Sequence, residues 1–183
     1  SAAIVWRTFE QSRLEEMAAD AGVPVINALT DDYHPCQILA DLLTVLEVKG
    51  STAGLTFAYL GDGANNMAHS YLLGCALAGM HVRIGTPASH PPRADIVARA
   101  QRIAAEQGGA VLVTDDPLAA VAGADVVATD TWVSMGMEAE SEHRHGAASP
   151  FERFRVTQGL MDHAVPDAVF LHCLPAYRGY EVD

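Results

Sequence analysis

The sequence predicts an α/β protein with a doubly wound parallel sheet. Apolar runs of strand length recur along the whole chain, and segments with helical periodicity separate them. Glycine, proline and aspartate mark the ends of several helical segments. Strands that alternate with helices in this way are typical of βαβ units, in which the strands lie parallel. We therefore expect a Rossmann-like sheet with helices on both faces.

The expected strands and helices follow one another in a regular order. The strands are residues 4–6, 24–29, 55–60, 81–84, 110–113, 125–129 and 168–171. The helices are residues 35–48, 65–78, 93–107 and a short one that starts at Pro117 and stops before Gly123. Apolar residues at three- to four-residue spacing support the helices at 65–78 and 93–107, which end at glycines. Asp116 is a suitable N-cap for the short helix.

The helix at residues 35–48 is expected to connect two lobes. Its apolar residues cover more than one stripe, so we expect it to pack on two sides. Residues 4–6 are expected to form a buried strand, which means that the chain begins inside a domain. The segment at residues 138–150 is polar and has no hydrophobic pattern, so we expect a mobile loop there.

The composition restricts the classes of function. The chain has 183 residues, of which 50% are hydrophobic and 19% are charged, as in a globular protein. A net charge of -12 argues against nucleic-acid or anionic-membrane partners. No apolar run is long enough for a membrane span. The three cysteines have no CxxC spacing, which favours free thiols in a reducing compartment. We therefore expect a cytoplasmic protein.

His34 and Gln37 are candidates for binding a substrate oxygen. They lie three residues apart at the start of the helix at 35–48, so they share one face near the positive end of its dipole. That place suits polar groups directed at a carbonyl or phosphate oxygen. The alternative is N-capping, because the residues at 30–34 offer several cap candidates.

The segment Gly61-Asp62-Gly63-Ala64-Asn65-Asn66 joins a strand to a helix, as a dinucleotide-binding loop does. The third glycine of that pattern is replaced by Asn66, and Gly85-Thr86-Pro87 stands where the ribose-binding acid is expected. We therefore expect no nicotinamide cofactor. The amide of Asn66 can instead donate to a carboxylate at the helix start. A tight turn without a ligand is the alternative.

Asp130 and Cys173 each follow an apolar strand, so both are expected at the carboxyl edge of the sheet. A buried acid needs a partner, and a substrate ammonium would supply one; capping of the next turn is the alternative. The Cys173 thiol is either an inert core group or, beside a cationic amine, a favoured thiolate.

The remaining histidines give no metal-binding pattern. His90, His143 and His145 are expected to be solvated, because no third ligand has a matching spacing. We expect neither a metal nor any other cofactor.

Four segments together resemble ornithine carbamoyltransferases. They are His34-Pro35-Cys36-Gln37, the segment at 61–66, Asp130-Thr131-Trp132-Val133-Ser134-Met135-Gly136 and His172-Cys173-Leu174-Pro175. The resemblance covers essentially the whole chain and corresponds to the middle and carboxyl-terminal part of such an enzyme. It implies that residues 1–33 are a remnant of the carbamoyl-phosphate-binding domain, residues 34–50 the interdomain helix and residues 51–183 the ornithine-binding domain. The family's Ser-x-Arg-Thr-Arg loop and final helices do not occur, so we expect the 183 residues alone to be inactive.

The resemblance also implies a reaction and a set of site residues. The carbamoyl group of carbamoyl phosphate would pass to the δ-amino group of L-ornithine, giving citrulline and phosphate without a covalent enzyme intermediate. Arg7, His34 and Gln37 would contact carbamoyl phosphate and stabilise the oxyanion. Ornithine would be held by Asn66, Asp130, Ser134, Met135, Cys173 and Leu174. The partners implied are these two small molecules and the identical subunits of a trimer, with no nucleic acid and no membrane.

Three alternatives stay open at this point. One is a carbamoyltransferase for aspartate or putrescine. Aspartate enzymes of this superfamily typically carry His-Pro-Leu-Pro at the place of His172-Cys173-Leu174-Pro175, and putrescine has no carboxylate to bind. The second is the nucleotide-binding module of a dehydrogenase, which a titration with NAD tests. The third is a catalytically silent fragment that only binds an amino acid or a partner chain.

Overall fold

The computed structural model describes residues 2–133, 144–146 and 148–183. The elements are β1 (Ile4–Arg7), α1 (Gln11–Asp20), β2 (Val25–Leu29), α2 (Pro35–Lys49), β3 (Thr56–Leu60), α3 (Asn66–Leu77), β4 (His81–Gly85), α4 (Ala94–Gln107), β5 (Ala110–Thr114), α5 (Pro117–Val121), β6 (Val126–Thr129), η2 (Glu152–Phe154), α7 (Gln158–Met161) and β7 (Val169–His172). All the expected strands are present with bounds shifted by one residue at most. The predicted α/β class is confirmed.

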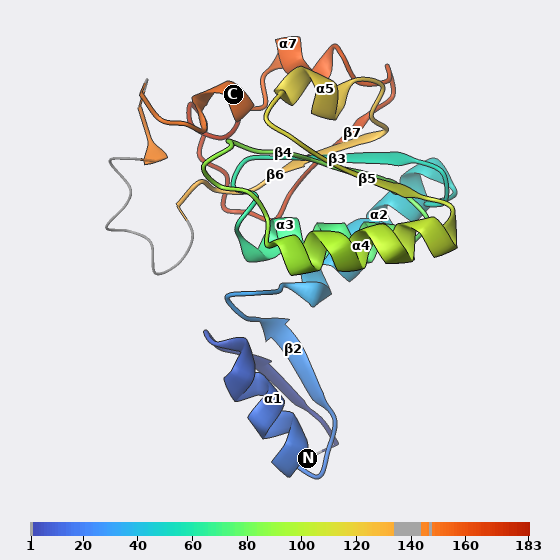
Figure 1. Cartoon of the computed structure of the whole chain (residues 1–183), viewed down its shortest axis with the longest axis vertical. Helices are drawn as coiled ribbons and strands as arrows, with labels where there is room; N and C mark the ends of the chain where they lie inside the picture. Colours follow the sequence, from blue (N-terminus) through green and yellow to red (C-terminus); the bar gives the residue numbers. More distant parts are fainter. Residues whose placement is uncertain (1, 134–143, 147) are drawn as a thin grey trace.

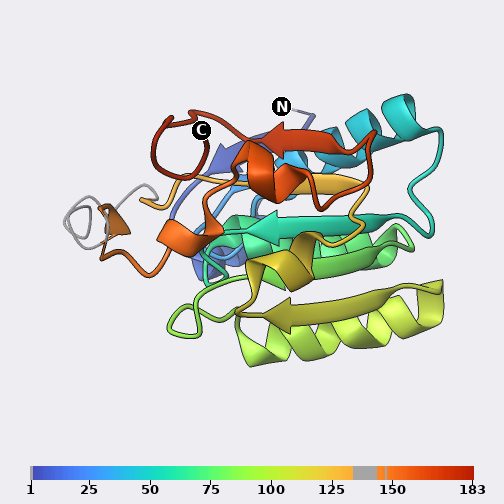
Figure 2. The same cartoon turned by 90° about the horizontal axis from the view of Figure 1, so that it is seen from above.

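The main body is a five-stranded parallel sheet with the strand order β5-β4-β3-β6-β7. Helices α2, α3 and α4 cover one face, and α5 and α7 cover the other (Figure 1). Every residue of β3 and β6 is buried, because these central strands have helices on both sides. The chain order reverses between β3 and β6, and the crevice at such a switch point is where α/β sheets bind ligands. The arrowheads in Figure 2 point to that edge.

The amino-terminal part forms a smaller unit, in which β1 and β2 pair in parallel and α1 packs beside them (Figure 1). We expected residues 4–6 to be buried, and this was wrong: Val5 is 66% exposed, and its neighbour Ile26 is 44% exposed. Side chains alternate between the two faces of a strand, and in the described part of the chain α1 covers only one face of this pair.

Helix α2 lies between β2 and β3 and so joins the two units, but it does not pack on two sides as we expected. Its inner face buries Ile38 and Val45 in the core beside α3. The apolar residues of the other face are exposed: Leu39, Leu43, Leu46 and Val48. Nothing in the described residues covers that face, which explains the difference from the prediction. None of the described helices is both long and apolar enough to cross a membrane.

Candidate active site

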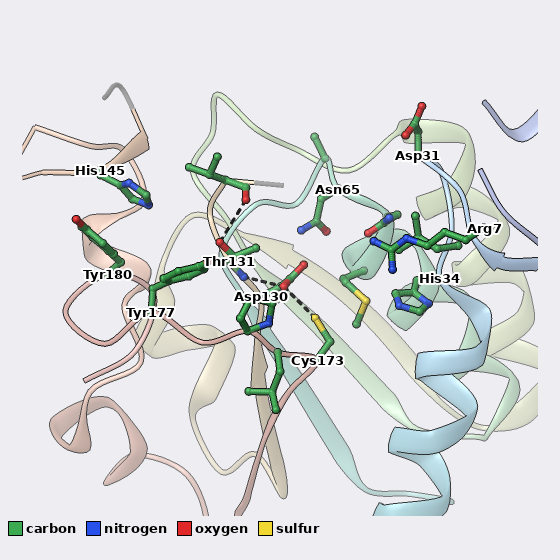
Figure 3. Close-up of a pocket in the computed structure, with 17 residues that line it drawn as sticks. Arg7, Asp31, His34, Asn65, Asp130, Thr131, His145, Cys173, Tyr177 and Tyr180 are labelled. Carbon is green, nitrogen blue, oxygen red and sulfur yellow. Dashed lines mark hydrogen bonds between the residues drawn. The ribbon is translucent and has the colours of Figure 1, made fainter. Parts of the chain in front are cut away.

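A pocket of about 750 Å³ lies at the carboxyl ends of β2, β6 and β7 and at the start of α3 (Figure 3). Its lining comes from both structural units. Arg7, Asp31 and His34 lie on one side, Asp130 and Cys173 lie in the middle, and His145, Tyr177 and Tyr180 lie on the other side. A concave site with a few convergent polar groups at a switch point is the typical form of a small-molecule site.

Asp130 and Cys173 form the centre of the pocket. Asp130 is 7% exposed, and its Oδ1 accepts hydrogen bonds from the Cys173 thiol at 2.9 Å and from the Thr131 N–H at 2.7 Å. Burial raises the pKa of Asp130, while these two donors oppose the shift. Burial and the nearby Asp130 charge raise the pKa of the Cys173 thiol. The thiol therefore acts as a protonated donor to Asp130 in this structure.

His34 and Arg7 lie next to each other on the opposite wall (Figure 3). The His34 side chain makes no capping hydrogen bond to α2, so the capping alternative does not apply to it. Burial, and then the charge of Arg7, lower the pKa of His34, which favours a neutral imidazole. Its Nδ1 is buried and has no hydrogen-bond partner within the described residues. This wall thus pairs a cation with a neutral imidazole that can bind a ligand.

Gln37 is not brought to the pocket lining, although it lies one turn after His34. Its Nε2 donates to Oδ1 of the buried Asp41 at 3.0 Å. The Tyr71 hydroxyl donates to the other carboxylate oxygen of Asp41 at 2.6 Å. No local pattern in the sequence marks Asp41, because an acid in a helix is usually solvated.

The two asparagines at the start of α3 divide their roles. Asn65 caps the helix, because its Oδ1 accepts from the Ala68 N–H at 2.8 Å. Asn66 lines the pocket, but its Nδ2 donates to the carbonyl oxygen of Thr30 at 2.8 Å. Gly63 is required by packing: a Cβ there would lie 2.8 Å from the carbonyl oxygen of His90. This contact is by itself sufficient to require a glycine at this position.

Other predicted residues have different outcomes. Ser134, Met135 and His143 lie outside the described residues. Leu174 lines the pocket with an exposed side chain and a φ of 60°, and its N–H donates to His172 Nδ1 at 2.9 Å. This backbone conformation is uncommon for a residue other than glycine.

Part of the segment at 138–150 is packed and not the mobile loop that we expected. Arg144 is 4% exposed, and its Nη1 donates to Asp62 Oδ2 at 2.5 Å and to the carbonyl oxygen of Trp132 at 2.9 Å. Nor are the described histidines simply solvated. The ring of His145 stacks on Tyr180 at a centroid distance of 4.0 Å, and the ring of His90 contacts Phe151. These side chains carry no local sequence signal, because their partners are distant in the chain.

One group of side chains has a composition that could hold a metal ion. Ligand atoms of Asp130, His172 and Cys173 lie within 4.8 Å of one another. They already bind one another or their neighbours, however. The Cys173 thiol donates to Asp130, and His172 Nε2 lies 3.1 Å from Glu181 Oε1. A metal would have to replace these hydrogen bonds.

The pH dependence of stability can be predicted from two histidines. Burial lowers the pKa of both His34 and His69 from 6.5. As the pH falls below 6.5, these histidines bind protons in the unfolded chain before they do so in the folded protein. The free energy of unfolding therefore decreases as the pH falls from about 6.5 through the folded-state pKa values. Urea denaturation at several pH values measures this slope. His69→Gln should make the slope shallower, and an unchanged slope would exclude His69 as its source.

The fold and the pocket are those of the class of α/β proteins that bind small polar molecules at the carboxyl edge of a parallel sheet. Two models of one family match the chain. The aspartate/ornithine carbamoyltransferase Asp/Orn-binding domain matches residues 53–183, and the carbamoyl-P-binding domain of the same family matches residues 1–47. The chain belongs to the aspartate/ornithine carbamoyltransferase family.

Named relatives agree with this family. The chain is 63% identical to the ornithine carbamoyltransferase of Clavibacter sepedonicus over 181 residues, which are 99% of this chain and 58% of that protein. The ornithine carbamoyltransferase of Renibacterium salmoninarum is 61% identical, with 99% of this chain and 57% of that protein covered. The crystal structure of the enzyme from Gloeobacter violaceus has a TM-score of 0.89 at 44% identity over 99% of this chain and 59% of its own.

The solved ornithine carbamoyltransferase of Pyrococcus furiosus is also similar, with a TM-score of 0.92 and 45% identity over 98% of this chain and 56% of its own. The chain thus spans somewhat more than half the length of the relatives that it matches.

Proposed function

We propose that the complete protein transfers the carbamoyl group of carbamoyl phosphate to the δ-amino group of L-ornithine, giving L-citrulline and phosphate. The main support is the placement of the Arg7–His34 pair and the Asp130–Cys173 pair around one pocket. The first pair suits an anionic donor with a carbonyl group, and the second suits a cationic amine. The names of the relatives point to the same reaction.

Carbamoyl phosphate, the carbamoyl donor, is assigned to the wall that carries Arg7 and His34. The guanidinium attracts the phosphate, and a neutral imidazole N–H can donate to the carbamoyl oxygen as negative charge develops on it. We assign Gln37 to the same substrate by family resemblance, although its amide nitrogen binds Asp41 in this structure.

L-Ornithine, the carbamoyl acceptor, is assigned to the side of the pocket that carries Asp130 and Cys173. An alkylammonium has a pKa of about 10.4 in water, so only about one amine in a thousand is a free nucleophile near neutral pH. The Asp130 carboxylate orients the ammonium, and the pocket excludes water around it. By resemblance, Asn66, Ser134, Met135 and Leu174 hold the α-amino and α-carboxylate groups of ornithine, with Met135 and Leu174 contributing backbone groups.

The reaction needs no covalent intermediate on the protein. The neutral δ-nitrogen forms a bond to the carbamoyl carbon, and a tetrahedral species results. The bond between that carbon and the phosphate oxygen then breaks, and the electron pair leaves with phosphate, which also takes up the proton released by the amine. Orientation and oxyanion stabilisation supply most of the acceleration.

The wider organisation of the protein is also a proposal. Residues 1–33 belong to the carbamoyl-phosphate-binding domain, residues 34–50 form the interdomain helix, and residues 51–183 belong to the ornithine-binding domain. The complete enzyme acts in the cytoplasm as a homotrimer, and it requires no cofactor. The 183 residues alone are inactive, because the family's Ser-x-Arg-Thr-Arg loop does not occur in them.

The complete protein should form citrulline from carbamoyl phosphate and L-ornithine. Calorimetry should show binding of L-ornithine and of L-norvaline, which lacks only the δ-amino group. Putrescine and L-aspartate should bind more than about tenfold more weakly, because putrescine lacks the carboxylate and aspartate brings a second carboxylate next to Asp130. A protein that binds these ligands but forms no citrulline would be a silent amino-acid binder, and one that prefers aspartate would contradict the proposed substrate.

A further inference from the structure

The connection between β2 and α2 is held along one face of α3. Asn66 Nδ2 donates to the carbonyl oxygen of Thr30 at 2.8 Å, and the N–H of His34 donates to Ser70 Oγ at 2.8 Å. Positions 66 and 70 are one turn apart, so their side chains point to the same side of α3. His69 lies between these two contacts on the same face.

His69 bridges this connection to a third segment. It is 2% exposed, its Nδ1 lies 3.3 Å from the carbonyl oxygen of Asp32, and its Nε2 lies 3.3 Å from the N–H of Arg93. A backbone N–H only donates, so Nε2 must be the acceptor and Nδ1 must carry the proton. Both ring nitrogens are thus satisfied in one neutral tautomer. Arg93 Nη1 also pairs with Asp32 Oδ2 at 3.1 Å across the same gap.

The bridged connection contributes to the pocket. Asp31 and His34 line it from residues 30–34, and Asn65 and Asn66 line it from the start of α3. Figure 3 shows Asp31 and His34 on the Arg7 side and Asn65 nearer to Asp130. The hydrogen bonds to α3 therefore set the distance between the proposed carbamoyl-phosphate side and the proposed ornithine side of the pocket.

We propose that His69 is a positioning residue, which holds residues 30–34 against α3 and aligns the two sides of the pocket. The kinetic part of this inference depends on the proposed function, whereas the bridge itself does not. The surroundings of His69 support the neutral bridge. Burial lowers its pKa, and the charges that face it are Asp32 and Asp62, which raise that pKa, and Arg93, which lowers it.

Two substitutions separate the two ends of the bridge. Asparagine places an amide near the position of Nδ1, so His69→Asn keeps the donor to Asp32 and loses the acceptor for Arg93. Glutamine reaches the position of Nε2, so His69→Gln keeps that acceptor. His163→Asn, at an exposed position, is the control. Hydrogen exchange at the amides of His34 and Arg93 reports the bridge, and exchange in β3 reports global unfolding.

In the complete protein, His69→Gln loses the donor that holds Asp32, so it should speed exchange at the His34 amide about tenfold more than in β3 and lower kcat/KM for carbamoyl phosphate about tenfold. His69→Asn should instead speed exchange at the Arg93 amide and keep most of the His34 protection and of kcat/KM, and His163→Asn should change none of these. In His69→Gln, unchanged exchange at His34, or faster exchange there with normal kinetics, would overturn the proposal. If the wild-type protein forms no citrulline, the proposed function fails, and exchange at His34 alone decides whether His69 fixes the pocket wall.

Discussion

Asp130→Asn is expected to reduce citrulline formation by about 10²- to 10³-fold and, at neutral pH, to stabilise the fold by about 1 kcal/mol. The loss of activity follows from the loss of the charge that orients the ammonium. The gain in stability follows from burial, which raises the folded-state pKa of Asp130 above its ordinary value of 3.8. An acid whose pKa is raised by folding stabilises the folded state at low pH, and this contribution is lost as the pH rises through the folded-state pKa. Asparagine does not ionise, so the variant does not suffer this loss.

Urea denaturation at several pH values tests the expected stability difference between Asp130→Asn and the wild type. The variant and the wild type should have nearly equal stability at low pH, and the variant should gain as the pH rises through the folded-state pKa of Asp130. Asparagine retains an oxygen that can accept from Cys173, so the local packing is preserved. The exposed Asp115→Asn is a matched control, which should change neither property. Wild-type kinetics in Asp130→Asn would exclude the role that we assign to this acid.

The main body of the fold was predictable because its signals are local. The strands β3 and β6 are short continuous apolar runs, and capping residues separate them from helices. Asp116, for example, accepts from the Leu118 N–H at 3.0 Å, and Gly50 ends α2 with a φ of 78°. Such turns and caps depend on a few neighbouring residues, so they can be inferred without knowledge of the tertiary structure.

Helix α1 was not predicted, and the reason is physical. Leu14 is its only buried residue, so the helix has almost no apolar stripe to show in the sequence. For α2 the prediction failed in the opposite way, because an apolar face that was expected to be packed is exposed. A wide apolar surface indicates contact with a partner on each side, but it does not show whether the partner lies in the same 183 residues.

The centre of the candidate site was predictable for a topological reason. Asp130 and Cys173 are 43 residues apart, but each follows a strand of one parallel sheet, and β6 and β7 are neighbours. Their side chains therefore meet at 2.9 Å. Gln37 shows the limit of this reasoning. Helical spacing placed it on the face of His34, but spacing gave no sign that the buried Asp41 would bind its amide.

The role of Arg144 was not visible in the sequence, because its partner Asp62 lies 82 residues away. This pair gives the largest stability effect that we expect. The two side chains are 5% and 2% exposed, and removal of either one takes a charged hydrogen-bond partner away from a buried charge. Arg144→Met or Asp62→Asn alone should therefore lower the free energy of unfolding by about 3–5 kcal/mol.

The double variant should be more stable than the sum of the two single effects predicts, because it removes both buried charges of the pair together. A double-mutant cycle by urea denaturation measures this coupling, which should be at least about 1 kcal/mol. Asp95→Asn, in the exposed pair with Arg93, should leave stability nearly unchanged. Additive effects of the two single substitutions would show that Asp62 and Arg144 do not stabilise each other. The pair connects the loop before α3 to Trp132, so its loss should also weaken L-ornithine binding, whereas Asp95→Asn should not.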